Sequence, residues 1–143
     1  MKILALDLGT TTGWAYLDQH GIECGYWTSK TYAPWGAFLI EALSLYKPDI
    51  IVCSQTNSYG HFNATKKMYM LYGIVCLLAE RCLYPVVEFN DSSARKAVFG
   101  SGKLKKIEAH AKLDELHPEF KEFTGDQKDS VILALGWQKL NNL

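Results

Sequence analysis

The segment Ile50-Ile51-Val52-Cys53 constrains the fold most, because every one of its side chains is apolar. A strand with one solvated face alternates apolar and polar residues, whereas a strand covered on both faces is apolar throughout. Residues 2–8 form a second apolar run, which is interrupted by Asp7 and closed by Gly9. The two runs predict a sheet with helices on both of its faces.

Apolar spacing and turn residues predict the remaining elements. Strands are expected over residues 13–17, 22–28 and 86–89, and helices over 34–46, 64–82, 105–116 and 126–140, with a further helix that Asp91 or Ser92 caps and that ends near Gly100. Residues 18–21 turn the chain, so the first two strands form a hairpin. The length of 143 residues and the 48% hydrophobic content suit a single α/β domain over residues 1–143, with a mixed five-stranded sheet flanked by helices.

Composition argues against several classes of protein. Lysine and arginine together number 15, as do aspartate and glutamate, so the net charge neither indicates nor excludes a nucleic-acid partner. No apolar run is long enough to span a bilayer, and the first residues form a strand rather than a signal peptide. The four cysteines lack CxxC spacing, which argues against zinc. The sequence therefore predicts a cytoplasmic protein with free thiols and no membrane partner.

Asp7 is the first candidate site residue. An ionised carboxylate in an apolar strand is unfavourable unless a cation meets it. Asp7 is interpreted either as a hydrogen-bonded turn former ahead of Gly9, or as a metal ligand or general base. Its expected place in the middle of a strand favours the second interpretation.

Asp126 and Asp129 form the second candidate. Their spacing of three residues puts them on one helix face, which also holds Leu133, Trp137 and Leu140. The acids are therefore expected to face the core side of the helix. The structural alternative is that Asp126 caps the helix and Asp129 stabilises its dipole, which explains Asp129 less well.

Three carboxylates far apart in the sequence are what a divalent-cation site requires. Mg²⁺ prefers carboxylate oxygens, and two such ions held together activate a water and stabilise the leaving oxygen of a phosphodiester. Asp7, Asp126 and Asp129 come from different elements of an α/β fold. We therefore expect them to meet at one end of the sheet.

Four segments occur in an informative order: residues 3–10 with 12–15, residues 48–52 with Gln55, residues 85–89 with Arg95 and 98–100, and residues 126–130 with Leu133-Ala134. Together they resemble the RuvC-type Holliday junction resolvases, which have an RNase H-like fold, over nearly the whole chain. The last segment is similar to the DxxDA-type motif of that family's active site. The resemblance implies a homodimeric endonuclease that uses Mg²⁺, with Mn²⁺ as a substitute, to resolve four-way junctions and other branched DNA.

Ser54 departs from the family pattern. The resemblance implies an active site of four carboxylates. Asp7, Asp126 and Asp129 match the first, third and fourth of them. Ser54 stands at the position of the second. A hydroxyl is a poorer Mg²⁺ ligand than a carboxylate, so Ser54 predicts weakened catalysis. Because the residues around Ser54 keep the family pattern, we interpret Ser54 as a substitution made to inactivate the protein rather than as a native change. In the alternative, Ser54 is an ordinary strand-end residue and Glu88 replaces the acid, but the family already has a glutamate there outside its catalytic set.

Basic residues gather around the flexible segment Gly100-Ser101-Gly102, which suits contacts with phosphates. They are Arg95, Lys103, Lys105 and Lys106, for which a solvated surface is the structural alternative. The resemblance implies that Arg95 and Lys106 approach the scissile phosphate, although the family usually has a lysine in place of Arg95.

The polar, turn-rich segment 55–67 is the last candidate for DNA contact. Its candidate residues are Gln55, Tyr59, Phe62, Lys66 and Lys67. The aromatic rings suit stacking on unpaired bases, and the lysines suit phosphates. Core packing, loop anchoring or solvation explains them equally well. The helix that follows, with Met68, Tyr69, Met70 and Tyr72, is the expected dimer interface.

Two other functions stay open. Residues 7–12 also resemble the first phosphate motif of actin-like and sugar-kinase ATPases, but those proteins need two such domains and a second phosphate motif. The other possibility is a branched-DNA-binding protein without catalysis, which Ser54 makes a real alternative. The host is interpreted as a bacterium or a phage-infected bacterium.

Overall fold

The computed structural model describes residues 1–56 and 62–141. Its strands are β1 (Ile3–Asp7), β2 (Thr11–Asp18), β3 (Gly21–Thr28), β4 (Ile50–Ser54) and β5 (Val86–Phe89), and its helices are α1 (Tyr32–Tyr46), α2 (Phe62–Arg81), α3 (Asp91–Phe99), α4 (Lys106–Leu116) and α5 (Gly125–Leu140), with a short 3-10 helix η1 (Pro118–Phe120). The strand order is β3-β2-β1-β4-β5. β2 pairs antiparallel with β1 and β3, and β4 pairs parallel with β1 and β5. The predicted mixed five-stranded sheet is confirmed.

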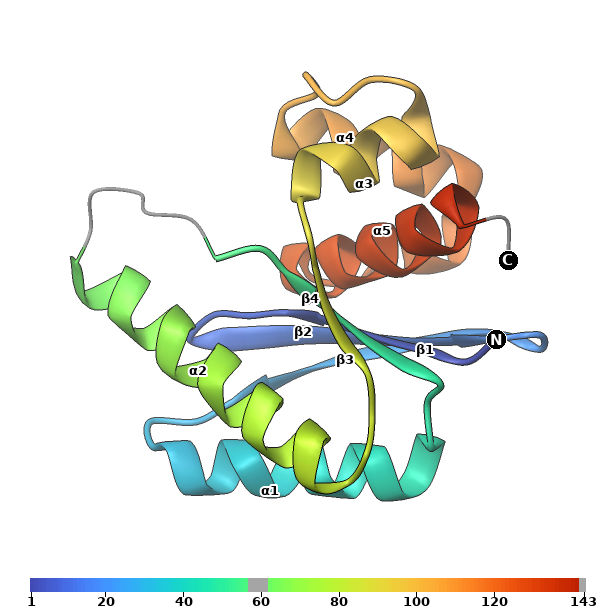
Figure 1. Ribbon diagram of the computed structural model, residues 1–143. Helices are drawn as coiled ribbons and strands as arrows, with labels where there is room; N and C mark the ends of the chain where they lie inside the picture. Colours follow the sequence, from blue (N-terminus) through green and yellow to red (C-terminus); the bar gives the residue numbers. More distant parts are fainter. Residues whose placement is uncertain (57–61, 142–143) are drawn as a thin grey trace.

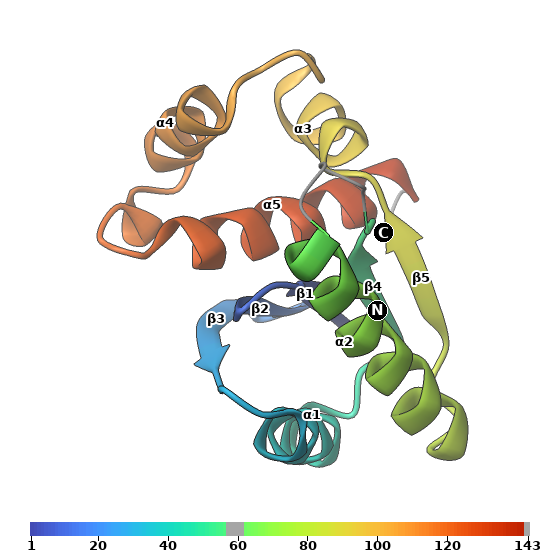
Figure 2. The ribbon, with the colours of Figure 1, turned by 90° about the vertical axis from the view of Figure 1, so that its left-hand side faces the viewer.

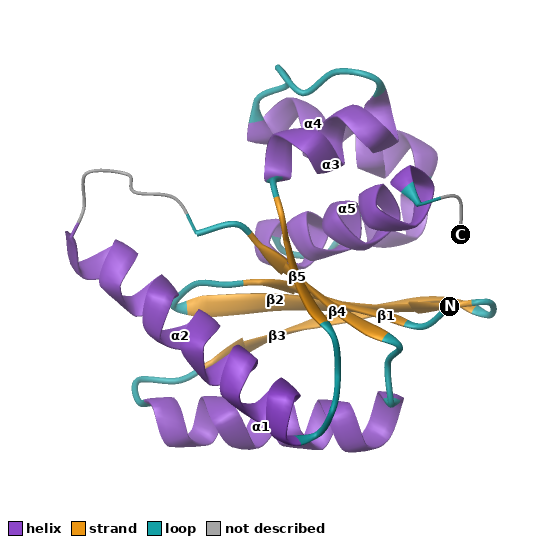
Figure 3. Cartoon of the chain, in the orientation of Figure 1, coloured by secondary structure: helices purple, strands orange, loops and turns teal. Residues whose placement is uncertain are grey.

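Helices cover both faces of the sheet (Figures 1 and 3). α1 and α2 lie on one face, and α5 lies on the other beneath α3 and α4, as Figure 2 shows from the side. Along β1, Leu4 and Leu6 pack in the α1–α2 core, whereas Ile3 and Ala5 pack in the α5 core. This alternation explains why β1 is apolar at successive positions and confirms the two-sided cover. No helix within the described residues is long and apolar enough to cross a membrane.

The helix caps differ from the sequence expectations. Asn90, rather than Asp91 or Ser92, caps α3, because its side chain accepts hydrogen bonds from two backbone N–H groups of the first turn. Thr124 caps α5, where it forms a capping box with Gln127. Capping is therefore excluded as the role of Asp126. An Asn just outside the apolar pattern is a weak signal, which explains the error at α3.

Two further expectations were wrong in detail. Asp7 is the last residue of β1 rather than a residue in its middle. On α5, Leu133 is buried, but Leu140, the last residue of the helix, is exposed. η1 was not expected, and it begins with Pro118, directly after the residue that caps the end of α4.

Two glycines let α5 pack closely against its neighbours. A side chain at Gly13 of β2 would collide with the backbone carbonyl of Asp126. At the other end of the helix, a side chain at Gly136 would come within 2.8 Å of the Cα atom of Ala94 on α3. α5 is therefore fixed between β2 and α3, and its first turn lies against the sheet.

Candidate active site at the carboxyl ends of the parallel strands

The candidate acids lie where the parallel strands end. β1 ends at Asp7 and β4 at Ser54, and because the two strands are parallel, both ends are at the same edge. The β1–β2 register puts Asp7 opposite Gly13, which contacts the backbone of Asp126. The fold therefore brings Asp7 and the first turn of α5 together, as the sequence predicts.

Asp7 lies in a setting that favours a cation. It is largely buried, and no hydrogen bond from the described residues stabilises its charged form. Burial raises the pKa of Asp7 to about 8, with help from repulsion by Asp129, Asp91 and Asp126 and against the attraction of Lys106. Close negative charges therefore surround this carboxylate.

Asp129 already has two cationic or polar partners. Its Oδ2 atom lies 2.7 Å from Nζ of Lys106, and its Oδ1 atom lies 2.7 Å from Nε2 of His110. Burial acts to raise the pKa of Asp129, but the hydrogen bonds from His110 and Lys106 outweigh it and lower the pKa. The contacts with Lys106 and His110 therefore hold Asp129 in its ionised form.

Ser54 has a structural role at the same edge. Its Oγ atom accepts a hydrogen bond of 3.0 Å from the backbone N–H of Leu8, so it links the end of β4 to the residue after β1. The next residue, Gln55, donates its backbone N–H to Phe89 and accepts a 3.0 Å side-chain bond from Asn90. The end of β4 is thereby tied to its neighbours on both sides.

The donor set fits a divalent cation by its chemistry. Asp7, Asp126 and Asp129 supply hard oxygen ligands, and Asp7 lies buried among like charges, where a cation would relieve the repulsion. In residues 1–56 and 62–141, no three His, Cys, Asp or Glu side chains are already grouped closely enough to hold an ion. Both oxygens of Asp129 are engaged by Lys106 and His110, so ligation by Asp129 requires an exchange of partners.

Two of the predicted basic residues lie beside the acids. Arg95 donates from Nη1 to the backbone oxygen of Leu104 at 3.2 Å, which fixes the loop before α4. Lys106 is the first residue of α4, and its ammonium group pairs with the Asp129 carboxylate. Burial, and next repulsion by Asp129, raises the pKa of Asp91, and the attraction of Arg95 and Lys106 opposes this only in part. Lys103, Lys105 and Lys106 are all exposed, but of these three only Lys106 forms a salt bridge within the described residues.

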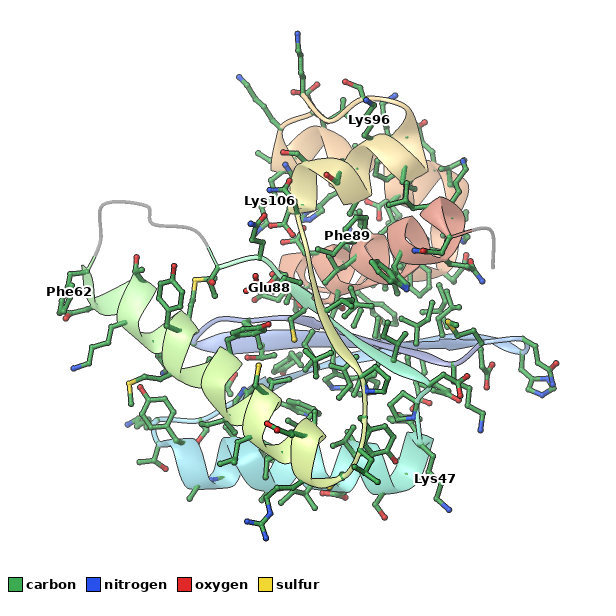
Figure 4. The ribbon with its side chains drawn as sticks, viewed as in Figure 1. Lys47, Phe62, Glu88, Phe89, Lys96 and Lys106 are labelled. Carbon is green, nitrogen blue, oxygen red and sulfur yellow. The ribbon has the colours of Figure 1, made fainter. Side chains whose placement is uncertain are left out.

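The candidates on α2 lie apart from the acids. Phe62 is 77% exposed at the start of the helix and points away from the rest of the protein (Figure 4). Lys66 is exposed and Lys67 half-buried on the following turn. Tyr59 lies outside the described residues. The candidate DNA-contact residues at the start of α2 therefore lie apart from the acids that α3 and α4 cover.

Two residues of the site were missed from the sequence. His110 contacts Asp129, and its only signal was its position four residues after Lys106, on the same helix face. Asp91 influences the pKa of Asp7 more strongly than Asp126 does. In the sequence Asp91 is a candidate helix cap, although it lies two residues after the end of a strand.

Comparison with known proteins finds sequence relatives that cover most of the chain. The chain is 30% identical to the crossover junction endodeoxyribonuclease RuvC of Rhizobium johnstonii, across 94% of this chain and 88% of that protein. It is also 30% identical to the RuvC of Rhizobium rhizogenes, across 94% and 87%. No protein-family model matches the chain.

Solved structures show the same fold at low sequence identity. Thermus thermophilus RuvC in complex with a Holliday junction substrate superposes with a TM-score of 0.82, at 16% identity, over 99% of this chain and 94% of that one. Fowlpox virus resolvase with its substrate Holliday junction DNA gives a TM-score of 0.63, at 15% identity, over 99% of both chains. From the sequence relatives and this shared fold, the chain belongs to the RuvC family of crossover junction endodeoxyribonucleases.

Proposed function

We propose that this protein is a structure-selective endonuclease that resolves Holliday junctions and other branched DNA in the cytoplasm. The observation that supports the proposal is that Asp7, at the end of β1, lies near the start of α5, which carries Asp126 and Asp129, with Lys106 paired to Asp129. Paired carboxylates and a nearby cation suit phosphodiester hydrolysis. Residues 1–143 act as one resolvase domain in this proposal.

Asp7, Asp126 and Asp129 would hold the divalent cation, Mg²⁺ or Mn²⁺ in its place. When bound, the cation supplies an activated water and charge stabilisation at the leaving oxygen. Lys106 is well placed to stabilise negative charge on the scissile phosphate, since its ammonium group already lies 2.7 Å from Asp129. Arg95 positions the loop before α4, which brings Lys103, Lys105 and Lys106 towards the DNA backbone.

A symmetric junction requires two cuts, and a homodimer supplies two sites. α2 is the interface that we propose, because Tyr69 and Met70 are 54% and 42% exposed along it. Phe62, Lys66 and the residues from Gln55 to Tyr59 precede or begin this helix. Contacts of these residues with unpaired bases at the branch point form part of the proposal.

The proposal is tested with a panel of end-labelled substrates: a four-way junction, a replication fork, a flap and a linear duplex. We expect cleavage of the branched substrates in Mg²⁺ and none of the duplex. The Asp126→Asn variant is expected to bind the junction without cutting it, because the change removes a ligand charge and keeps the shape. Equal binding of duplex and junction would contradict structure selectivity, and junction binding without cleavage by the unchanged chain would favour the non-catalytic alternative.

A further inference from the structure

We propose that the Asp91 carboxylate takes the place of the acid missing at Ser54 and completes the set of carboxylates that binds the divalent cation. This inference rests on the proposed function. It assigns a ligand role to a residue that the family motif does not contain. The following observations carry it.

The backbone brings Asp91 to the place where an acid is missing. Ser54 pairs with Phe89 in the parallel β4–β5 ladder, and Asp91 follows Phe89 by two residues. The backbone bond from Gln55 to Phe89, at 3.1 Å, holds the two strand ends together. A carboxylate lost from the end of one strand is therefore matched by a carboxylate just past the end of the adjacent strand.

The Asp91 side chain is free to take this role. Asn90, and not Asp91, accepts the hydrogen bonds of the α3 N-terminus. Asp91 is half-buried, and no hydrogen bond from the described residues stabilises its carboxylate. Its charged neighbours are Asp129, Arg95 and Lys106, which are residues of the candidate site.

Asp7 gives independent support. This carboxylate is largely buried at the same edge, and no hydrogen bond from the described part of the chain stabilises it. Asp91 lies close enough to repel the charge on Asp7, as Asp129 and Asp126 also do, so the four carboxylates share one region of the sheet edge. Asp91 therefore faces the same space as the acids that the family motif identifies.

Glu88, the other candidate for the missing acid, lies on the wrong face. It pairs with Cys53, which is buried in the α1–α2 core. Phe89 and Ala5 pack on the α5 side of the sheet, and Asp7 lies on the same face of β1 as Ala5. Glu88 is exposed, and its carboxylate accepts a long bond of 3.4 Å from Thr56. It acts on the pKa of Cys53 rather than on that of Asp7.

Stabilisation of the α3 N-terminus is the structural alternative for Asp91. The two roles differ in whether the residue changes metal affinity. We would titrate the full-length protein with Mn²⁺ and follow binding by calorimetry and by the electron paramagnetic resonance of the free ion. Asp91→Asn keeps the side-chain shape, Glu88→Gln is the matched control, and circular dichroism melts verify that each variant folds.

We expect Asp91→Asn to weaken Mn²⁺ binding by about tenfold or more, because a charged ligand is lost, and Glu88→Gln to leave it unchanged. In the Asp91→Asn protein, adding Ser54→Glu should restore affinity and junction cleavage together. Ser54→Glu alone should change cleavage little, since the carboxylate set is already complete. If Ser54 instead weakens catalysis, as expected from the sequence, Ser54→Glu alone should raise cleavage by orders of magnitude.

Unchanged Mn²⁺ affinity in a folded Asp91→Asn protein would overturn the inference, and so would a loss that Ser54→Glu fails to restore. If the unchanged chain binds no Mn²⁺ and cuts no junction, the proposed function fails together with the inference. If the unchanged chain binds and cuts while Asp91→Asn behaves identically, only the role of Asp91 is refuted.

Discussion

Asp7 links the stability of the protein to the chemistry of its site. Its pKa is raised from 3.8 to about 8 in the folded state, chiefly by burial and next by Asp129. Between about pH 4 and pH 8 the folded state therefore holds one proton more than the unfolded chain, and the free energy of unfolding falls as the pH rises. A bound cation opposes this loss by stabilising the ionised form.

We predict that Asp7→Asn raises the melting temperature in EDTA, and that the gain is larger at about pH 8 than at about pH 5. The variant lacks the proton-linked penalty, so a gain of roughly 2–4 °C per kcal/mol is expected for a chain of this size. Thermal unfolding by circular dichroism at the two pH values measures it. A gain that is the same at both values would show that Asp7 titrates normally.

Lys106 should affect cleavage far more than binding. Its ammonium group lies against Asp129 in the site, so Lys106→Ala removes charge stabilisation near the reacting phosphate. We expect cleavage of a bound junction to slow by about 10²-fold or more. Lys105→Ala, at the exposed neighbouring position, is the matched control. If both variants slow cleavage equally, Lys106 contributes only to the general attraction for DNA.

At the residue scale, the sequence identified acids that stand out from their surroundings and missed those that do not. Asp7 interrupts an apolar strand, so its unusual setting was visible in the sequence. Asp91 and His110 lie in polar stretches, where such residues are common at helix ends and on helix surfaces. Their importance arises only from the contacts that the fold creates with Asp129 and Asp7.

At the scale of elements, the close contact between α5 and β2 positions the acids. Gly13→Ala places a methyl group against the Asp126 backbone, which must shift. We expect a loss of about 1–3 kcal/mol in the free energy of unfolding and a loss of cleavage. Gly73→Ala, in an open position of α2, should instead be neutral or stabilise by about 0.5–1 kcal/mol.

Urea denaturation measures both glycine variants. Equal stability of the two would mean that α5 relaxes away from β2 without strain, and that the contact does not fix Asp126. The position of α5 would then need another explanation.

Element types were predictable, whereas several of their ends were not. The apolar strands β1 and β4 and the long periodicity of α2 determined the sheet and its cover, because burial on both faces leaves no alternative pattern. Caps depend on single side-chain contacts, and Asn90 and Thr124 gave only weak signals. The short η1 helix has no periodicity that a sequence pattern could reveal.

At the scale of the whole molecule, the two helical layers have different roles in this account. The α3–α5 layer covers the acids and carries Lys106, whereas α2 presents Tyr69 and Met70 on the opposite face of the sheet. One face would thus hold the chemistry and the other the proposed dimer contact. The balanced net charge of the chain conceals this separation, so composition alone did not predict it.

In the proposed function, carboxylates at the sheet edge use a divalent cation to cut branched DNA. The most direct measurement is cleavage of an end-labelled four-way junction by the unchanged protein in Mg²⁺ and in EDTA, with binding followed in parallel by gel shift. We predict paired cuts on opposite strands in Mg²⁺, and binding without cuts in EDTA. Cleavage that persists in EDTA, or intact junctions in Mg²⁺ despite tight binding, would contradict the account.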